Sequence, residues 1–300
     1  MAMLALVGPT ASGKSEAAIA IAPGLGAEIV SVDSMLVYRG MDIGTAKPTI
    51  EQRAVVPHHL LDLAEPSERF TVARYQELAR GALRSIARPL LVGGSGLYLR
   101  AVLDELAFPP EDPVVRASLE AEADDLGADA LYRRLADMDP VAAARIEPGN
   151  VRRIIRALEV TAISGAPFSS FATAWDRYDA NRVRAAGIRM DREVQKIRIG
   201  ERVLAMLRNG WLEEVQGLLD RGFGGWLTAS QAIGYAELAE HLDGRLSLDE
   251  AAERTVKRTR ELARRQMAWF RRDPRIRWFD VGPGGAAEVA DDVRAYLGSA

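Results

Sequence analysis

The chain has 300 residues and a formal net charge of −3, and its 48% hydrophobic and 27% charged residues are ordinary for a soluble globular protein. This length predicts one large domain accompanied by a smaller one. There is no cysteine, which excludes disulfides, thiolate catalysis and cysteine-ligated zinc. No tract approaches the roughly 18 apolar residues that a membrane span needs, so we expect no membrane partner.

The N-terminal sequence MAMLALVGPT has no basic stretch before its short apolar run, which predicts a buried first strand rather than a signal peptide. We therefore expect a cytoplasmic protein, acting as a monomer. The negative net charge argues against a chain that coats nucleic acid through overall positive charge. A local basic region does exist, because the stretch from Arg254 to Arg277 holds ten Lys or Arg residues against two acids.

Up to Gly94, short apolar runs alternate with helical patterns, as is typical of parallel βαβ units. The pattern predicts strands at 4–7, 28–32 and 89–92 and helices at 12–21 and 73–86. Strands of this kind are buried on both sides. The sequence therefore predicts an α/β fold, a parallel sheet with helices on both faces.

From about Pro109 the pattern is helical, through a helix predicted at 151–163. Asp139 and Pro140 form a helix start, and Gly165 stands where a helix-ending left-handed residue belongs. A predicted strand at 183–190 returns the chain to the sheet. Helices at 193–207, 211–219 and 248–270 and a strand at 276–281 follow. We thus predict a discontinuous core, residues 1–108 and 183–300, with a helical insertion at 109–182.

Residues 8–15 read GPTASGKS and match the phosphate-binding pattern GxxxxGK[ST] between a predicted strand and a predicted helix. Backbone N–H groups in such a loop converge on a diphosphate, the lysine adds a point charge, and the final hydroxyl can bind Mg²⁺. The alternative is a glycine-rich turn that binds nothing. The loop predicts a P-loop NTPase-like core without implying ATP, with the diphosphate held by Gly8, Pro9, Thr10, Ala11, Ser12, Gly13, Lys14 and Ser15.

Two further segments leave predicted strands near this loop. Asp33 follows the second strand, and the carboxyl ends of strands in open parallel sheets line the ligand crevice. Its carboxylate can order Mg²⁺ through water, accept a proton or cap the next turn, and the sequence does not separate these roles. Ser95 offers a hydroxyl between glycines that permit close backbone approach, and a tight strand-to-helix turn is the alternative.

Seven further segments form a distinctive series: SVDSMLVYRGMDIGTAKP (31–48), PHHLLD (57–62), GGSGLYL (93–99), DPVAAARI (139–146), RALEV (156–160), QAIGY (231–235) and TRELARRQMAWFR (259–271). In order and spacing they resemble the tRNA dimethylallyltransferase family of the bacterial type. The similarity runs from Leu4 to Trp278, and the first of these segments is far more specific than the phosphate loop.

The resemblance implies transfer of a dimethylallyl group from dimethylallyl diphosphate to the exocyclic amino nitrogen of an adenosine, with release of diphosphate. The adenosine lies 3′ of the anticodon in tRNAs that read codons beginning with U, so the implied partner is the tRNA anticodon stem-loop. Mg²⁺ is the implied cofactor, with Ser15 as its ligand. Asp33 is the implied general base, and Ser95 stands where the family usually has Thr. Arg192, in DREVQKIR, can reach the donor diphosphate from the edge of the core, and an ion pair at the start of a helix is the alternative.

The resemblance also implies a set of RNA contacts: Asp33, Ser34, Met35, Leu36, Ser95, Arg116, Arg152, Arg153, Ile154, Ile155, Arg156, Gln231, Lys257, Arg258, Arg264 and Arg265. Leu36 replaces a common Gln, which removes a side-chain hydrogen bond there. Helical spacing independently places the arginines of 151–163 off the apolar stripe of that helix, where they can contact phosphates or form an ordinary solvated face.

Three other functions share some of these features. A P-loop kinase acting on a small metabolite would have the same loop and sheet, but it would not explain the arginine-bearing insertion. A prenyltransferase acting on free adenine nucleotide would need no RNA-binding lobe. A non-catalytic RNA-binding module would not need Asp33 as a base.

Overall fold

The computed structural model describes residues 2–104, 106–172, 177–226, 228–282 and 284–299. The chain forms two compact units, Met1–Leu103 with Tyr178–Ala300, and Asp104–Arg177, which we call the sheet unit and the helical unit. The helical unit begins and ends earlier than the predicted 109–182. The returning chain already packs on the sheet unit at Tyr178, whose ring lies 4.4 Å from the guanidinium of Arg100 and 5.2 Å from that of Arg275.

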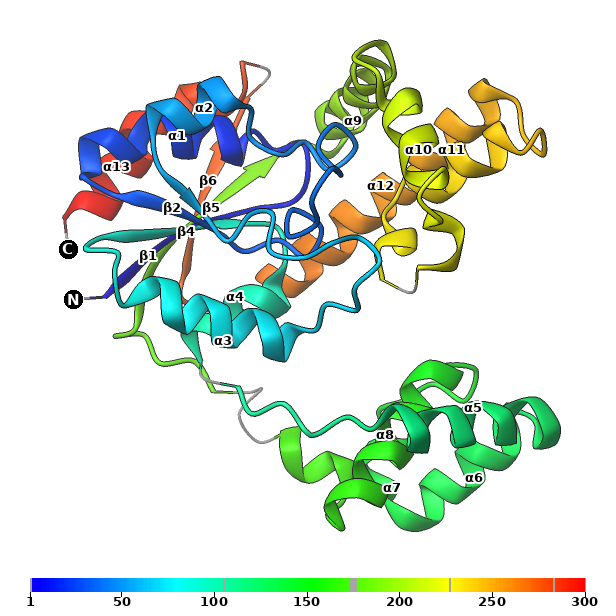
Figure 1. Cartoon of the computed structure of the whole chain (residues 1–300). Coiled ribbons are helices and arrows are strands. Elements are labelled where there is room, and N and C mark those ends of the chain that lie inside the picture. The colour runs from blue at the N-terminus through cyan, green and yellow to red at the C-terminus, as the bar shows by residue number, and fades with distance from the viewer. Residues whose placement is uncertain (1, 105, 173–176, 227, 283, 300) are drawn as a thin grey trace. The chain divides into compact units, whose positions relative to one another are not determined.

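The sheet unit is built on a parallel sheet, and its six strands within the described residues have the order β3-β2-β4-β1-β5-β6 (Figure 1). The strands are β1 (Met3–Val7), β2 (Glu28–Ser31), β3 (His58–His59), β4 (Pro89–Gly93), β5 (Val183–Met190) and β6 (Ile276–Val281). Every pair of neighbouring strands is parallel. The predicted α/β fold is confirmed.

Side chains of successive strand residues point to opposite faces of the sheet, so each strand feeds two cores. Leu4 and Leu6 of β1 pack in one core with α1 (Lys14–Leu25) and α13 (Ala290–Gly298). Ala5 and Val7 pack in the other core, with α3 (Val72–Leu83) and α4 (Gly96–Leu103). Figure 1 shows these two helix pairs on opposite faces of the sheet.

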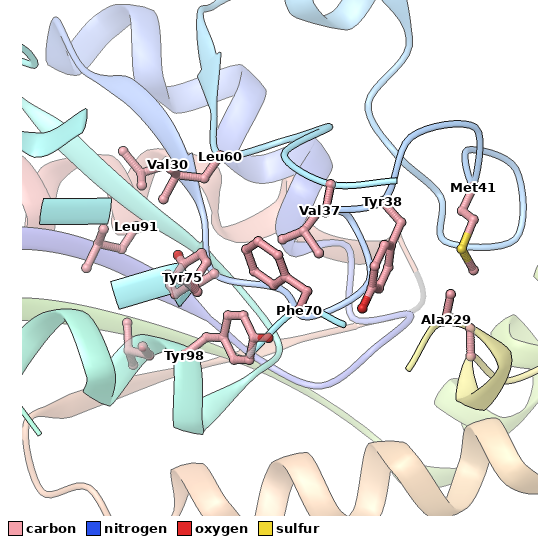
Figure 2. Close-up of a cluster of buried hydrophobic side chains, with 14 of the residues drawn as sticks. Val30, Val37, Tyr38, Met41, Leu60, Phe70, Tyr75, Leu91, Tyr98 and Ala229 are labelled. Atoms are coloured by element: carbon pink, nitrogen blue, oxygen red, sulfur yellow. The ribbon is translucent and has the colours of Figure 1, made fainter. Parts of the chain in front are cut away.

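The second core continues past the end of the sheet as a cluster of aromatic side chains (Figure 2). Tyr75 and Tyr98 have ring centroids 4.4 Å apart, and the Tyr38 ring meets the edge of Phe70. The Tyr75 hydroxyl donates a 2.6 Å hydrogen bond to the carbonyl of Ser31, the last residue of β2. This bond fixes the backbone immediately before Asp33.

Four helices after β5 pack against one another at the carboxyl end of the sheet. They are α9 (Arg192–Arg208), α10 (Trp211–Leu219), α11 (Tyr235–Leu242) and α12 (Leu248–Phe270), and α12 also contacts α4. The sequence predicted three of them but not α11, nor the short α2 (Ile50–Val55). Both are brief: α11 has three buried residues and α2 has none, so neither has a long apolar stripe.

The first helix begins at Lys14 rather than at the predicted residue 12, because Gly13 has a left-handed backbone with φ of 84°. It continues to Leu25, with Pro23 in its last turn. Residues 12 and 13 therefore belong to the phosphate loop, whose N–H groups are left outside the regular helix.

The helical unit contains α5 (Pro113–Leu126), α6 (Ala128–Met138), α7 (Pro140–Ala143) and α8 (Val151–Ser164) around its own apolar core. The predicted caps are confirmed: Asp139 accepts a hydrogen bond from the N–H of Ala142 at 3.0 Å, and Gly165 has φ of 67° after α8. Among the described helices of both units, none combines the length and apolarity required to span a membrane.

Candidate active site

Three chain segments leave the sheet side by side at the carboxyl ends of their strands. The phosphate loop follows β1, Asp33 follows β2, and Ser95 follows β4, which lies between β1 and β2. The backbone of Val32 connects two of these segments, because its N–H donates to Val92 at 2.8 Å and its carbonyl accepts from the N–H of Ser95 at 3.3 Å. The parallel sheet thus gathers the three candidate segments at one edge.

The phosphate loop is held from outside by two helices that meet at Thr10. The Thr10 N–H donates to Oε1 of Gln266 on α12 at 2.8 Å, and its carbonyl accepts from Nε2 of Gln195 on α9 at 2.9 Å. Its hydroxyl accepts a longer bond, 3.4 Å, from the guanidinium of Arg202 on α9. The sequence did not single out these three side chains, and they fix the loop before any ligand arrives.

The loop residues therefore differ in what they can offer an anion. The N–H of Thr10 is already bonded to Gln266, and Pro9 has no N–H to donate, so neither offers a backbone donor to an anion here. Contact of these two residues with the diphosphate through other atoms stays a prediction. The N–H groups at the start of α1, including those of Lys14 and Ser15, have no acceptor within their own helix. These remaining donors form the cradle for an anion.

The charge of the Asp33 side chain acts on both Lys14 and Arg202, and the charge of Arg202 acts on Lys14. The pKa of the Lys14 amine is lowered to about 8, first by burial and then by the positive charge of Arg202, against the opposing effect of the Asp33 carboxylate. Burial also lowers the pKa of Arg202, although Asp33 and Glu16 act in the opposite direction. Two cations brought together in this way favour a bound anion.

Asp33 is half-buried and uses one carboxylate oxygen as a turn cap. Its Oδ1 accepts from the N–H of Met35 at 2.8 Å. Within the described part of the chain, Oδ2 has no hydrogen-bond partner. The capping role and a role as a base are therefore compatible, because each can use a different oxygen.

Ser95 lies directly before α4 and its hydroxyl accepts from the N–H of Tyr98 at 3.4 Å, so it caps this helix. A side chain of α12 covers the following residue: a Cβ on Gly96 would lie 1.8 Å from the indole of Trp269. Trp269 is 37% exposed. An aromatic ring is thus placed beside the residue that follows Ser95 in the chain.

A basic groove of about 210 Å³ lies between α9 and α12. Its lining residues are Arg192, Gln195, Lys196, Ile199, Lys257, Arg260, Glu261, Ala263 and Arg264. It brings Arg192, predicted to reach the diphosphate, together with Lys257 and Arg264, predicted to contact RNA. Gln195 connects this groove to the phosphate loop through its bond to Thr10.

In the helical unit, a buried carboxylate organises two of the predicted RNA-binding arginines. Glu159 accepts from Arg116 at 2.6 Å, from Arg156 at 2.8 Å and from the N–H of Asp112 at 3.0 Å. Burial alone would raise the pKa of Glu159, but these hydrogen bonds outweigh it and the pKa is lowered. The carboxylate of Glu159 thus fixes the positions of the Arg116 and Arg156 guanidinium groups.

Two residues of the same helix do not fit their predicted role. Ile154 is 0% exposed and Ile155 is 6% exposed, both in the core of the helical unit, so the prediction that they contact RNA is wrong for their side chains. The helical stripe already placed them there, and only the resemblance suggested otherwise. Arg152 and Arg153 are exposed on the other face of α8, as predicted.

The remaining predicted contacts lie in the sheet unit. Arg258 pairs with Glu237, a buried residue that also accepts from the N–H of Gly234, so it is committed to holding α11. Gln231 and Arg265 are exposed. Ser34, Met35 and Leu36 are half-buried in the segment after Asp33.

The residues beside the cradle fit Mg²⁺ that arrives with phosphate. The described residues contain no cluster of three or more His, Asp or Glu side chains able to enclose a metal ion. Mg²⁺ is commonly held by one or two protein oxygens together with substrate phosphates. The exposed Ser15 at the start of α1 and the nearby Asp33 supply that kind of donor set.

The fold and the site define an α/β protein of the P-loop NTPase-like class. Comparison with known families is more specific. The family described as IPP transferase matches residues 36–273, and the family described as isopentenyl transferase matches residues 1–57. The chain belongs to the IPP transferase family, which confirms the resemblance.

Individual relatives agree along the whole chain. A tRNA dimethylallyltransferase of Desulforudis audaxviator is 48% identical over 294 residues, covering 95% of each chain. One of Salinispora tropica is 49% identical over 297 residues, covering 97% of this chain and 92% of the other. The crystal structure of a Bacillus halodurans tRNA isopentenylpyrophosphate transferase has a TM-score of 0.72 at 39% identity, covering 99% of this chain and 96% of that one.

The lowered pKa of Lys14 makes anion binding depend on pH. An anion stabilises the protonated amine, so binding above about pH 8 takes up a proton and weakens as the pH rises. We expect half-maximal labelling of Lys14 by an amine-specific reagent near pH 8, followed by peptide mass spectrometry, and protection by inorganic pyrophosphate. Labelling that begins only near pH 10, or that pyrophosphate leaves unchanged, would contradict this assignment.

Proposed function

We propose that this protein transfers a dimethylallyl group from dimethylallyl diphosphate to the exocyclic amino nitrogen of the adenosine 3′ of the anticodon, in tRNAs that read codons beginning with U. The observation that carries the proposal is the meeting of Lys14, Arg202 and Asp33 at one edge of the sheet, in a chain whose relatives over nearly its full length are named tRNA dimethylallyltransferase. The cytoplasm is the proposed location.

Each charged group has a role in this reaction. The amino group of adenine is a poor nucleophile because its lone pair is delocalised into the ring, so Oδ2 of Asp33 takes its proton as the new bond forms. Lys14, Arg202 and the N–H groups at the start of α1 stabilise the negative charge that grows on the departing diphosphate. Mg²⁺, held by Ser15 and the diphosphate, would neutralise part of that charge.

The base must leave its stack to reach Asp33, and base-modifying enzymes commonly extrude their target nucleotide. Trp269 beside Gly96 offers an aromatic surface at this place. The exposed cations of the groove can bind RNA phosphates, and so can those of α8 in the helical unit, which positions the RNA without reading its sequence.

The kinase alternative is not favoured. The relatives named tRNA dimethylallyltransferase match nearly the full length of the chain, and the arginine-bearing helical unit lies within the matched family region. A kinase would need the phosphate loop and leave this unit without a role.

The decisive experiment is nucleoside mass spectrometry of tRNA incubated with the pure protein, Mg²⁺ and dimethylallyl diphosphate. We expect one adenosine per anticodon loop to gain the mass of a dimethylallyl group. Incubation with ATP in place of the prenyl donor is the control for a kinase, and incubation with AMP in place of tRNA tests transfer to a free nucleotide. Unmodified tRNA alongside modified AMP would overturn the assignment of tRNA as substrate.

Asp33→Asn tests the proposed base while preserving the turn. The amide oxygen can still accept from the N–H of Met35, but the side chain can no longer take a proton. We expect single-turnover transfer to slow by about 10²- to 10⁴-fold with tRNA affinity changed by less than about threefold. A variant with near-normal turnover would remove Asp33 from the chemistry, and a large loss of tRNA affinity would point to a binding role instead.

Replacing Arg152 and Arg153 together with Ala tests the proposed RNA face of α8. Each lost phosphate contact should reduce the slope of log affinity against log salt by about 0.7 to 0.9, since fewer counterions are released. Filter binding of an anticodon stem-loop between low and moderate salt measures the slope. Arg133→Ala, another exposed arginine of the helical unit, is the control. An equal slope in the double variant and the wild type would take these arginines out of the interface.

A further inference from the structure

The carboxylate of Glu214 on α10 accepts four hydrogen bonds from two segments that are distant in the chain. Oε2 of Glu214 accepts from the N–H groups of Asp42 at 2.8 Å and Ile43 at 2.7 Å. Oε1 accepts from the N–H of Gly44 at 3.2 Å and from the hydroxyl of Tyr235 at 2.6 Å. Three consecutive backbone N–H groups pointing at one anion form a nest, and hydrogen bonds to a charged acceptor are stronger than neutral ones.

The protonation states support this arrangement. Tyr235 is fully buried, and burial together with the nearby Glu214 carboxylate raises the pKa of its phenol. The phenol therefore stays protonated at neutral pH and donates to Glu214.

The nest belongs to the segment that carries the proposed base. Asp33 opens this segment, and the nest at 42–44 closes its loop. Just after the nest, the buried Lys47 reaches back into this segment: it donates to the carbonyl of Tyr38 at 2.6 Å and pairs with Asp42 at 2.5 Å. Fixing the nest therefore limits where the residues just after Asp33 can lie.

The other partner of Glu214 belongs to a second proposed RNA-contacting segment. Tyr235 closes the QAIGY segment, which also contains Gln231. Trp211 lies under both segments: a Cβ on Gly44 would lie 2.1 Å from its indole nitrogen, and a Cβ on Gly234 would lie 2.0 Å from its ring. Apolar packing thus brings the two segments together, while Glu214 sets their orientation.

We infer that Glu214 is a positioning residue for the reaction, holding the segment after Asp33 and the segment around Gln231 in the arrangement that receives the nucleotide. This inference rests on the proposed function. Trp211, Val215 and Leu218 bury α10 in the core, whereas Glu214 supplies directed hydrogen bonds to the two segments. Glu214 does not contact the diphosphate cradle. Its loss should therefore lower kcat/KM for the RNA substrate and leave binding of the prenyl donor unchanged.

Glu214→Gln is the informative change. An amide has one accepting oxygen, and its NH₂ group would oppose a backbone N–H of the nest, donor against donor. We expect kcat/KM for an anticodon stem-loop to fall by about 10- to 100-fold, from the loss of charge-assisted hydrogen bonds, with KM for dimethylallyl diphosphate within about twofold. Tyr235→Phe removes one of the four bonds and should give a smaller change in the same direction.

The matched control is Glu213→Gln, which removes the same charge from the neighbouring exposed residue of α10 and should leave both constants unchanged. If Glu213→Gln and Glu214→Gln lower kcat/KM equally, general charge explains the effect and the inference fails. The inference also fails if Glu214→Gln changes KM for dimethylallyl diphosphate as much as it changes kcat/KM for the anticodon stem-loop.

Hydrogen exchange provides a test that does not depend on activity. In Glu214→Gln the amides of residues 42–44 should exchange at least about tenfold faster, with the amides of β1 and β4 unaltered. Unchanged exchange at 42–44 would overturn the inference even in an active enzyme. Faster exchange throughout the sheet would show a general loss of stability and would also overturn it. If wild-type protein fails to modify tRNA, the proposed function fails, whereas the exchange result still reports on Glu214.

Discussion

Parallel hydrogen bonding between β2, β4 and β1 brings the carboxyl ends of these strands to the same edge of the sheet. Val7 pairs with Gly93, and Ser31 pairs with Val92, so the three strands end nearly in register. The phosphate loop, Asp33 and Ser95 follow the ends of these strands by one or two residues, so all three lie at this edge of the sheet. Had one of these strands run antiparallel, its functional residue would lie at the opposite edge.

Three charged side chains, those of Lys14, Arg202 and Asp33, lie close together at this partly buried edge of the sheet. Burial lowers the pKa of both Lys14 and Arg202, and the charge of Arg202 lowers that of Lys14 further, while Asp33 acts in the opposite direction on both. A bound anion such as the proposed diphosphate would stabilise the charged forms of these two buried cations.

Elsewhere, buried or half-buried carboxylates hold polar segments in place. Glu214 holds a loop by its backbone, Glu159 holds two arginines of the helical unit, and Glu237 holds Arg258. Each of these acids satisfies several donors, which is how a charge is tolerated inside a protein. Arginines that look alike in the sequence therefore differ in their surroundings: Arg116 and Arg156 pair with the buried Glu159, whereas Arg152 and Arg153 are exposed.

The sequence alone determined the features that depend on neighbouring residues. The phosphate loop, the apolar runs of the buried strands, the helix caps at Asp139 and Gly165, and the family segments are all readable in short windows, because local backbone geometry and hydrophobic patterning act over a few residues. Only the tertiary structure decided which side chains meet across long stretches of chain. Gln266 and Arg202 at Thr10, and Glu214 at residues 42–44, join positions more than a hundred residues apart. Their contacts follow from how helices pack, which no local pattern specifies.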